Sequence, residues 1–372
     1  MKIGILTYHR AENYGALLQA YGLKTYLETL GHDVSFVDYW PDYHKEYFDL
    51  FPLAKFRTAG IKTKVKIIIN FCLFYLVRKT RKKNLQEFMY KHLGLSKKIK
   101  FNNESSRCND YDVVFYGSDQ IWRKQGMPSH PGFDLWYLGS DNIVTPKKIA
   151  YAASMGHANL QIEDFEMLKN AFKSFSFISV REKSLDSFVT DLGFPCKQVI
   201  DPVFLLSKAQ WQELSHSARK MSECKYILIY NLLSSEETVR FAEKLSREKK
   251  LPIIEINKRY VLSQFGNRYN HTAKVEEFLW LIENAEYVVS NSFHGVALSL
   301  IFQKQFFAVG MGERADRVKS LLSLTGLECR YMETGKYDLA DIEYGEVIEQ
   351  LKESVQTSKQ FIKHSLVDNY EI

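Results

Sequence analysis

Short apolar segments alternate with helical segments along almost the whole of this chain. In the first half, five segments rich in β-branched and aromatic residues are the expected strands: 2–8, 33–39, 111–116, 148–154 and 175–180. Strands that are apolar throughout, rather than at every second position, are typical of parallel sheets with helices on both faces. The pattern therefore predicts an α/β fold.

The same alternation returns in the second half, which indicates a second unit. Its expected strands are 226–232, 252–256, 287–290 and 305–309. The length of 372 residues also favours two domains, since one domain typically has about 150 residues. We predict two facing Rossmann-like units, with a C-terminal helix that packs back on the first. The expected boundaries are 1–205 and 206–340 for the units and 341–372 for the helix.

A helical insertion at about 52–93 carries the excess positive charge. Residues 50–86 contain no Asp or Glu, and the net charge of the whole chain is only +6. Ten basic residues lie there: Lys55, Arg57, Lys62, Lys64, Lys66, Arg78, Lys79, Arg81, Lys82 and Lys83. A nucleic-acid-binding protein usually spreads its charge more widely, so we do not expect nucleic acid as a partner.

The centre of this insertion, residues 67–77, is apolar, and two interpretations remain open. Residues 55–83 would contact an anionic membrane surface from the side, because basic residues around an apolar helix favour such a surface. Alternatively, the segment is a solvated helix whose apolar side joins the core. The apolar run is too short to span a bilayer.

Cysteines and glycines restrict the possible cofactors and compartment. The five cysteines form no C-x-x-C pair, and the histidines show no metal-ligand spacing, so no metal is expected. Neither a G-x-G-x-x-G motif nor a P-loop is present. The apolar start of the chain is too short for a signal peptide. We therefore expect a cytoplasmic protein, which the membrane interpretation above would place at the inner face of the membrane.

Polar residues at strand ends are the candidate site residues, because ligands of parallel α/β sheets bind at the carboxyl ends of the strands. Asn291-Ser-Phe-His-Gly295 joins an expected strand to an apolar helix. The amides of that helix would favour an anion, and His294 would donate a hydrogen bond or a proton to it. The alternative is a helix cap at Asn291 or Ser292 with a structural histidine.

Three further strand ends carry candidate groups, each with a structural alternative. Arg181 would bind a carboxylate or phosphate, or else pair with Glu182 at the surface. Asp119, within Gly117-Ser-Asp-Gln120, would act as a general base, with Trp122 as a stacking platform for a sugar; otherwise Asp119 caps a short helix. Asn13 more simply caps the first helix than binds a ligand.

Taken together, these motifs resemble the polysaccharide pyruvyl transferase family over nearly the whole chain. The matching stretches are Asn13-Tyr-Gly-Ala-Leu-Leu-Gln-Ala20, Gly117-Ser-Asp-Gln-Ile-Trp122, Ser179-Val-Arg-Glu182, Asp201-Pro-Val-Phe-Leu205 and Ser292-Phe-His-Gly295. The resemblance implies a glycosyltransferase-B-like arrangement, with the acceptor on the first unit and the donor on the second. It also implies transfer of a pyruvyl group from phosphoenolpyruvate to two sugar hydroxyls, with release of phosphate and without a cofactor. The acceptor would be a surface polysaccharide or its lipid-linked oligosaccharide precursor.

The resemblance assigns donor binding to Arg181 and phosphate binding to His294, and we expect His294 and Asp119 to be catalytic. The other expected substrate-binding residues are Ser292, Phe293, Gly295, Asn13, Gly117, Ser118, Gln120, Trp122 and Arg314. Many family members have an arginine where this chain has Ser292. Arg314, Arg317 or Lys258 would have to supply the missing charge.

Two other functions stay open. A glycosyltransferase that uses a nucleotide sugar would need a carboxylate for the ribose, such as Glu255 or Glu283. The other is the function of a non-catalytic family member in polysaccharide assembly. Ser292 supports it, because this position lacks the arginine of many family members.

Overall fold

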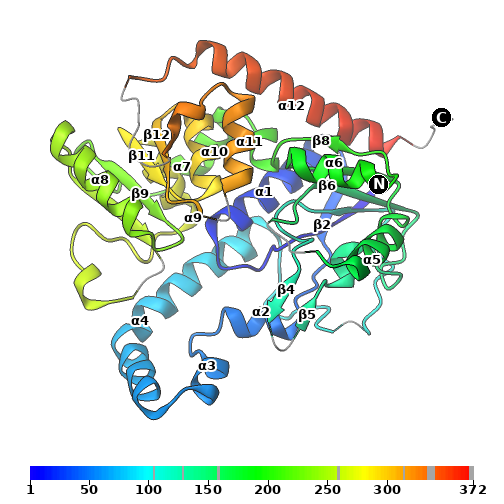
Figure 1. The fold of residues 1–372 in the computed structure, drawn as a ribbon, viewed down its shortest axis with the longest axis horizontal. Coiled ribbons are helices and arrows are strands. Elements are labelled where there is room, and N and C mark those ends of the chain that lie inside the picture. Colours follow the sequence, from blue (N-terminus) through cyan, green and yellow to red (C-terminus); the bar gives the residue numbers. More distant parts are fainter. Residues whose placement is uncertain are drawn as a thin grey trace.

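A computed structural model describes residues 1–103, 105–127, 130–156, 160–257, 260–312, 315–332 and 340–367. The described part contains two parallel sheets, each flanked by helices, which lie side by side along the long axis of the molecule (Figure 1). This is the predicted α/β architecture of two Rossmann-like units that face each other.

The first sheet has the strand order β2-β1-β3-β6-β7-β8, and all its pairs are parallel. Its strands are β1 (Lys2–Leu6), β2 (Asp33–Phe36), β3 (Val113–Tyr116), β6 (Lys147–Ala153), β7 (Phe177–Val180) and β8 (Lys197–Gln198). The helices among them are α1 (Tyr14–Thr29), α5 (Ile162–Phe172) and α6 (Lys183–Asp191). The predicted strands are confirmed, although most end one to three residues earlier than expected.

The second sheet has the order β10-β9-β11-β12-β13 and is also parallel. Its strands are β9 (Ile227–Asn231), β10 (Ile253–Asn257), β11 (Tyr287–Ser290), β12 (Gln305–Val309) and β13 (Tyr331–Met332). Its helices are α7 (Lys208–His216), α8 (Glu236–Lys249), α9 (Val275–Glu283), α10 (Phe293–Phe302) and α11 (Ala315–Leu324). Helix α10 begins three residues earlier than predicted, so His294 lies in its first turn.

One continuous apolar core joins the two halves of the chain. The ring of Tyr14 on α1 stacks on Phe278 of α9, with centroids 4.4 Å apart, and the Tyr14 hydroxyl donates to the carbonyl of Ala273 at 2.6 Å. Because these contacts are buried, they fix the carboxyl ends of the two sheets against each other.

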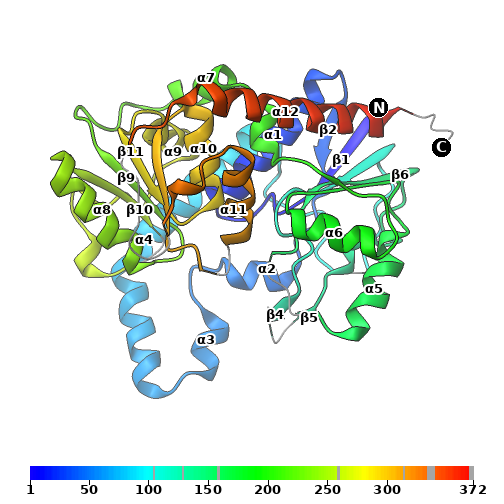
Figure 2. The same ribbon diagram turned by 45° about the horizontal axis from the view of Figure 1, so that its top comes forward.

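The last helix, α12 (Tyr344–Leu366), returns along the first sheet, as predicted (Figure 2). The amide of Ile200, just after β8, donates to the Ser358 hydroxyl at 3.0 Å. The ring of Phe361 packs edge-on against Phe177 of β7. These contacts confirm the expected position of the C-terminal helix.

The basic insertion is helical, as expected, and projects from the body of the molecule (Figures 1 and 2). It consists of α2 (Asp42–Tyr47), α3 (Leu53–Thr58) and α4 (Ile61–His92), and a small hairpin of β4 (Gln125–Met127) and β5 (His130–Gly132) lies near α2. Among the described residues, no helix has the length and apolar character needed to cross a membrane.

Candidate active site

The N-termini of two helices, one from each half of the chain, meet between the sheets. Asn13 caps α1 by accepting a hydrogen bond from the Gly15 amide at 3.2 Å, and it also accepts one from the Tyr230 hydroxyl of β9 at 3.3 Å. A Cβ atom on Gly15 would lie 2.1 Å from Nδ1 of His294, so only glycine leaves room for that imidazole. His294 is thus held where the positive ends of α1 and α10 converge.

A buried carboxylate links the two residues that we expected to bind the donor. Asp201 follows β8 and caps a short 3-10 turn, where its Oδ1 accepts from the Val203 amide at 3.1 Å. Its Oδ2 is paired with Nη1 of Arg181 and lies 3.5 Å from Nε2 of His294. All three side chains are buried. Arg181 and His294 therefore come together, through Asp201, at one point between the sheets.

The pair of Arg181 and Asp201 is ionised at neutral pH. Burial by itself would raise the pKa of Asp201, but His294 and Arg181 outweigh this effect and hold that pKa well below its usual range. Burial would likewise lower the pKa of Arg181, but three carboxylates, foremost that of Asp201, raise it instead. The carboxylate of Asp201 therefore carries a negative charge next to the imidazole of His294 at neutral pH.

Asp119 stands on the far side of this cluster, beside two guanidinium groups. Its Oδ1 lies 3.6 Å from Nη2 of Arg181 and 3.9 Å from Nη1 of Arg317. Both guanidinium groups also lie against the ring of Phe293, at 5.1 Å for Arg181 and 5.8 Å for Arg317. The ring of Phe293 is thus a contact that the two guanidinium groups share.

That space is a cavity of about 520 Å³ between the two halves. One wall consists of predicted site residues, namely Asn13, Asp119, Gln120, Ser292, Phe293 and His294, together with Arg317. The other wall is largely aromatic and comes from the ends of β1 and β2 and from α2, with Tyr8, Trp40, His44, Tyr47 and Phe48. A polar wall opposite an aromatic wall suits a ligand with an anionic end and a sugar ring.

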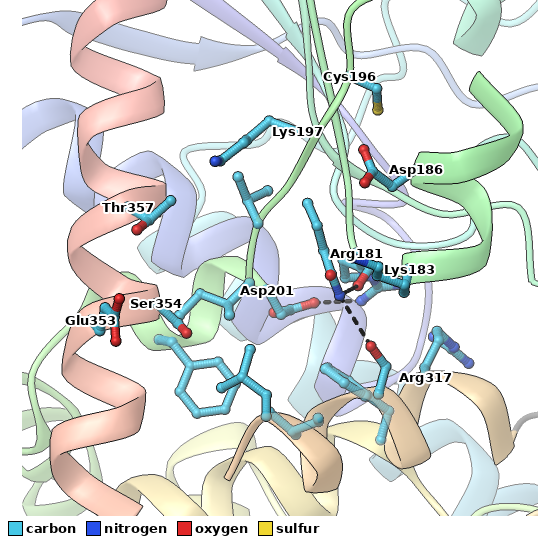
Figure 3. A pocket seen from close by; sticks show the side chains of 18 residues that line it. Arg181, Lys183, Asp186, Cys196, Lys197, Asp201, Arg317, Glu353, Ser354 and Thr357 are labelled. Carbon is cyan, nitrogen blue, oxygen red and sulfur yellow. Dashed lines mark hydrogen bonds and ion pairs between the residues drawn. The ribbon is translucent and has the colours of Figure 1, made fainter. Parts of the chain in front are cut away.

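Arg181 does not line this cavity but a neighbouring one of about 430 Å³. Figure 3 shows Arg181 and Asp201 joined at its centre, with Arg317 on one side and α12 on the other. Phe293 and Arg317 border both cavities. The guanidinium of Arg181 is therefore connected to the 520 Å³ cavity by its ion pairs with Asp119 and Asp201 and by its contact with Phe293.

Three of the expected substrate-binding residues, Gly117, Ser118 and Gly295, line neither cavity, and each of them shapes the backbone. Gly117 has a φ of 122°, and a Cβ there would lie 2.2 Å from the carbonyl oxygen of Tyr151. The hydroxyl of Ser118 donates to the carbonyl of Ala152 at 2.9 Å and is buried. A Cβ on Gly295 would lie 2.2 Å from the Ser290 hydroxyl. These residues bring β3 and α10 close to their neighbours, and so place Asp119 and His294.

The prediction for Trp122 is wrong, because this residue belongs to the core. Its side chain is fully buried, and its indole N–H donates to the carbonyl of Tyr137 at 3.0 Å. The ring packs against Phe172 of α5 and Phe175. The turn after β3 directs it under α5, away from the cavity. Arg314 and Lys258 lie outside the described residues.

Asp201 and the aromatic wall were not predicted. Asp201 begins the matching stretch Asp201–Leu205 and was given no role, although a carboxylate at the same sheet edge as Arg181 and Asp119 was an available signal. The aromatic wall follows β2, where no motif marks it. Burial, reinforced by the nearby His130 and His9, lowers the pKa of His44 to about 3, so this wall carries a neutral imidazole at neutral pH.

The carboxylates suggested for a nucleotide ribose are engaged elsewhere. Glu255 is buried and pairs with Arg268 at 3.2 Å. Glu283 accepts hydrogen bonds from Gln212 and Ser215 of α7. In the part of the chain that the structure describes, no three His, Cys, Asp or Glu side chains gather in a way that could hold a metal ion.

Solved structures with a similar fold include enzymes that act on nucleotide sugars. UDP-GlcNAc 2-epimerase from Neisseria meningitidis, bound to UDP-GlcNAc, has a TM-score of 0.45 and 8% identity, and the match covers 99% of this chain and 95% of that one. The MnaA–UDP structure from S. aureus has a TM-score of 0.43 and 10% identity, with 97% and 87% covered. UDP-GlcNAc 2-epimerase from Methanocaldococcus jannaschii has a TM-score of 0.42 and 11% identity, with 96% and 92% covered.

No curated protein matches the sequence. The family model for polysaccharide pyruvyl transferase, however, matches residues 13–312. This range runs from the cap of α1, through Asp119, Arg181 and Asp201, to the turn after β12, and so includes His294. The chain therefore belongs to the polysaccharide pyruvyl transferase family.

Proposed function

We propose that this protein transfers a pyruvyl group from phosphoenolpyruvate to two hydroxyls of one sugar, which forms a ketal and releases phosphate. The observation that carries the proposal is the position of His294. Its imidazole lies where the N-termini of α1 and α10 converge, at the wall of the 520 Å³ cavity. Helix N-termini favour phosphate dianions, and an imidazole beside them can donate a hydrogen bond or a proton to the leaving phosphate.

The donor also carries a carboxylate, so it needs more than one cation. This chain has Ser292 where many family members have an arginine, and we propose that Arg317 supplies the missing positive charge. Arg317 borders the cavity, one helix further along the chain, against the ring of Phe293. Arg181 adds to the positive potential from behind Phe293, while its ion pair with Asp201 keeps it in place. Phosphoenolpyruvate is a substrate of this reaction, and the proposed reaction uses no cofactor.

In the proposed reaction, an acid first protonates the methylene carbon of phosphoenolpyruvate, and an oxocarbenium-like centre forms at the adjacent carbon. One sugar hydroxyl attacks this centre and gives its proton to a base, for which Asp119 is the candidate. The second hydroxyl of the same sugar then displaces phosphate, whose charge is stabilised by His294 and the N-terminus of α10. The proton of the second hydroxyl leaves with the phosphate, and the proton that the base took from the first hydroxyl restores the acid.

The acceptor is proposed to be a sugar of a surface polysaccharide or of its lipid-linked precursor. The aromatic wall supports a sugar, because Tyr47 is 65% exposed while it borders the cavity. Separately from the reaction, the protein is proposed to work in the cytoplasm and to contact an anionic membrane surface through residues 55–83.

Phosphate release from phosphoenolpyruvate, measured with a panel of sugars, tests the proposal. We expect release that depends on the acceptor, and a loss of at least about 100-fold in His294→Ala with an unchanged circular dichroism spectrum. His216→Ala is the matched control, because the side chain of His216 is 65% exposed. Unchanged turnover in His294→Ala would remove this residue from the mechanism. Thermal stabilisation by a nucleotide sugar but not by phosphoenolpyruvate would favour a glycosyltransferase, and no response to either donor would favour a non-catalytic protein.

A further inference from the structure

The first half of α4 carries a row of exposed aliphatic side chains, which we call the apolar stripe. Its members are Ile61, Val65, Ile68, Ile69, Leu73 and Leu76, and each is between 45% and 82% exposed. At 100° per residue they fall within an arc of about 140° on one side of the helix. A stripe of this width normally faces a protein core, whereas this one faces solvent.

The opposite side of α4 is the one that contacts the protein. The ring of Phe74 is buried and stacks on Phe265 at 5.2 Å. The side chain of Asn70 donates to the carbonyl of Tyr260 at 2.8 Å, and Arg78 lies over the ring of Tyr260 at 4.7 Å. The inner side is therefore fixed, and rotation of the helix cannot bury the apolar stripe.

The charges around the apolar stripe are all of one sign. Lys62, Lys66 and Lys79 are exposed on α4, and Lys55 and Arg57 are exposed on α3. Residues 50–86 include no acidic residue, and none of these five bases forms an ion pair with a described residue. Long lysine side chains can extend to headgroups while their methylene stems cover apolar surface.

We propose that α3 and the first half of α4 bind an anionic lipid bilayer, with the apolar stripe inserted among the headgroups. Charge complementarity favours lipid over a second copy of this chain, because two copies would bring the same positive charges together. From Ile61 to Leu76 the helix is about 23 Å long, and it would lie in the plane of the membrane rather than across it.

Docking in this way would also orient the cavity. Tyr47 and Phe48 line the cavity and precede α3 by a few residues. The carbonyl of Phe48 accepts a hydrogen bond from Lys82 of α4 at 2.9 Å, and that of Leu50 accepts one from Arg78 at 3.4 Å. The aromatic wall is thus tied to the base of the docked helices. This consequence alone rests on the proposed function, since it places the acceptor subsite near a sugar that a lipid carries.

Co-sedimentation with vesicles of phosphatidylcholine, with or without one quarter phosphatidylglycerol, tests the proposal without donor or acceptor. We expect binding to the anionic vesicles that weakens at least tenfold in 0.5 M salt or without phosphatidylglycerol. The variant Ile69→Glu/Leu76→Glu should bind at least tenfold more weakly. The matched control is Ile162→Glu/Leu262→Glu, which adds the same charge at exposed aliphatic side chains of α5 and the loop after β10, and it should bind like the wild type.

Three results would overturn the proposal. The first is the absence of salt-sensitive binding by the wild type, and the second is an equal loss of binding in the control. The third is self-association in sedimentation velocity that Ile69→Glu/Leu76→Glu abolishes, without vesicle binding, because the stripe would then be an interface between copies. Phosphate release with a water-soluble acceptor should be the same in wild type and Ile69→Glu/Leu76→Glu. A wild type that binds vesicles but releases no phosphate would refute the proposed function and leave this inference standing.

Discussion

Asp201→Asn removes the negative charge that holds Arg181 and His294 together, and keeps the oxygen that caps the 3-10 turn. The guanidinium of Arg181 would remain buried, with Asp119 at 3.6 Å as its nearest remaining carboxylate. Breaking a buried ion pair by removing one partner costs about 3–5 kcal/mol. Because Asp119 compensates in part, we expect a loss of about 3 kcal/mol in the free energy of unfolding.

A double-mutant cycle measured by urea unfolding separates this pairing from other effects. Arg181→Met should also destabilise the protein, but the double variant should lose at least about 1 kcal/mol less than the sum of the two single losses. The control cycle is Glu236→Gln with Arg240→Met on α8, where both side chains are more than 70% exposed. There we expect a coupling below about 0.5 kcal/mol. Additive losses at Asp201 and Arg181 would refute the reasoning.

The pH dependence gives a second readout of the same pair. The folded protein lowers the pKa of Asp201 below its ordinary value of 3.8, so the unfolded state binds a proton more readily. The stabilisation is therefore fully present above about pH 4 and is lost as the pH falls below that value. Asp201→Asn should lessen the loss of stability on acidification below pH 4. An unchanged acid limb would show that Asp201 is not ionised in the fold.

Three further predictions concern the cavity and the residues packed around it. Burial lowers the pKa of His44 from 6.5 to about 3, so its proton uptake on unfolding should lower the free energy of unfolding by about 2 kcal/mol between pH 7 and pH 5. In urea unfolding, His44→Phe should remove this part of the pH dependence, and an unchanged pH dependence would contradict the prediction. Gly15→Ala should displace His294 and slow phosphate release at least about tenfold, whereas Gly345→Ala, which meets no atom within 4 Å, should not. Trp122→Phe should lower the unfolding free energy by about 2 kcal/mol and leave the KM for the sugar unchanged, since a changed KM would return this residue to the cavity.

The sequence pattern predicted the central strands of the two sheets well because these strands, such as β3 and β11, are buried along their whole length. Strands β11 and β12 begin and end where expected. The start of α10 was missed because no helix-favouring residue precedes Val296, and only packing against α1 and β11 extends the helix back to Phe293. Local pattern thus sufficed where a segment is buried evenly, and failed where a contact from the other half of the chain decides.

The same limit explains which site residues could be predicted. Asp119, Arg181 and His294 each follow a strand, and the carboxyl ends of parallel strands lie at one edge of a sheet. Trp122 also follows such a strand, but three residues of turn are enough to direct it beneath α5. The apolar stripe could be recognised as a helical pattern, whereas its exposure depends on which side of α4 Phe74 and Asn70 attach to the protein.

The positive charge of the site illustrates why a motif and a site are different things. Ser292 stands where many family members have an arginine, so the motif alone counts one cation fewer. The cavity nevertheless includes Arg317, because α11 follows β12 and so starts at the same edge of the second sheet as α10. Adjacent parallel strands place the first turns of their helices side by side. A cation that is missing at Ser292, at the start of α10, can therefore be replaced by Arg317 of α11. Arg317 lies 25 residues further along the sequence and borders the same cavity as Phe293.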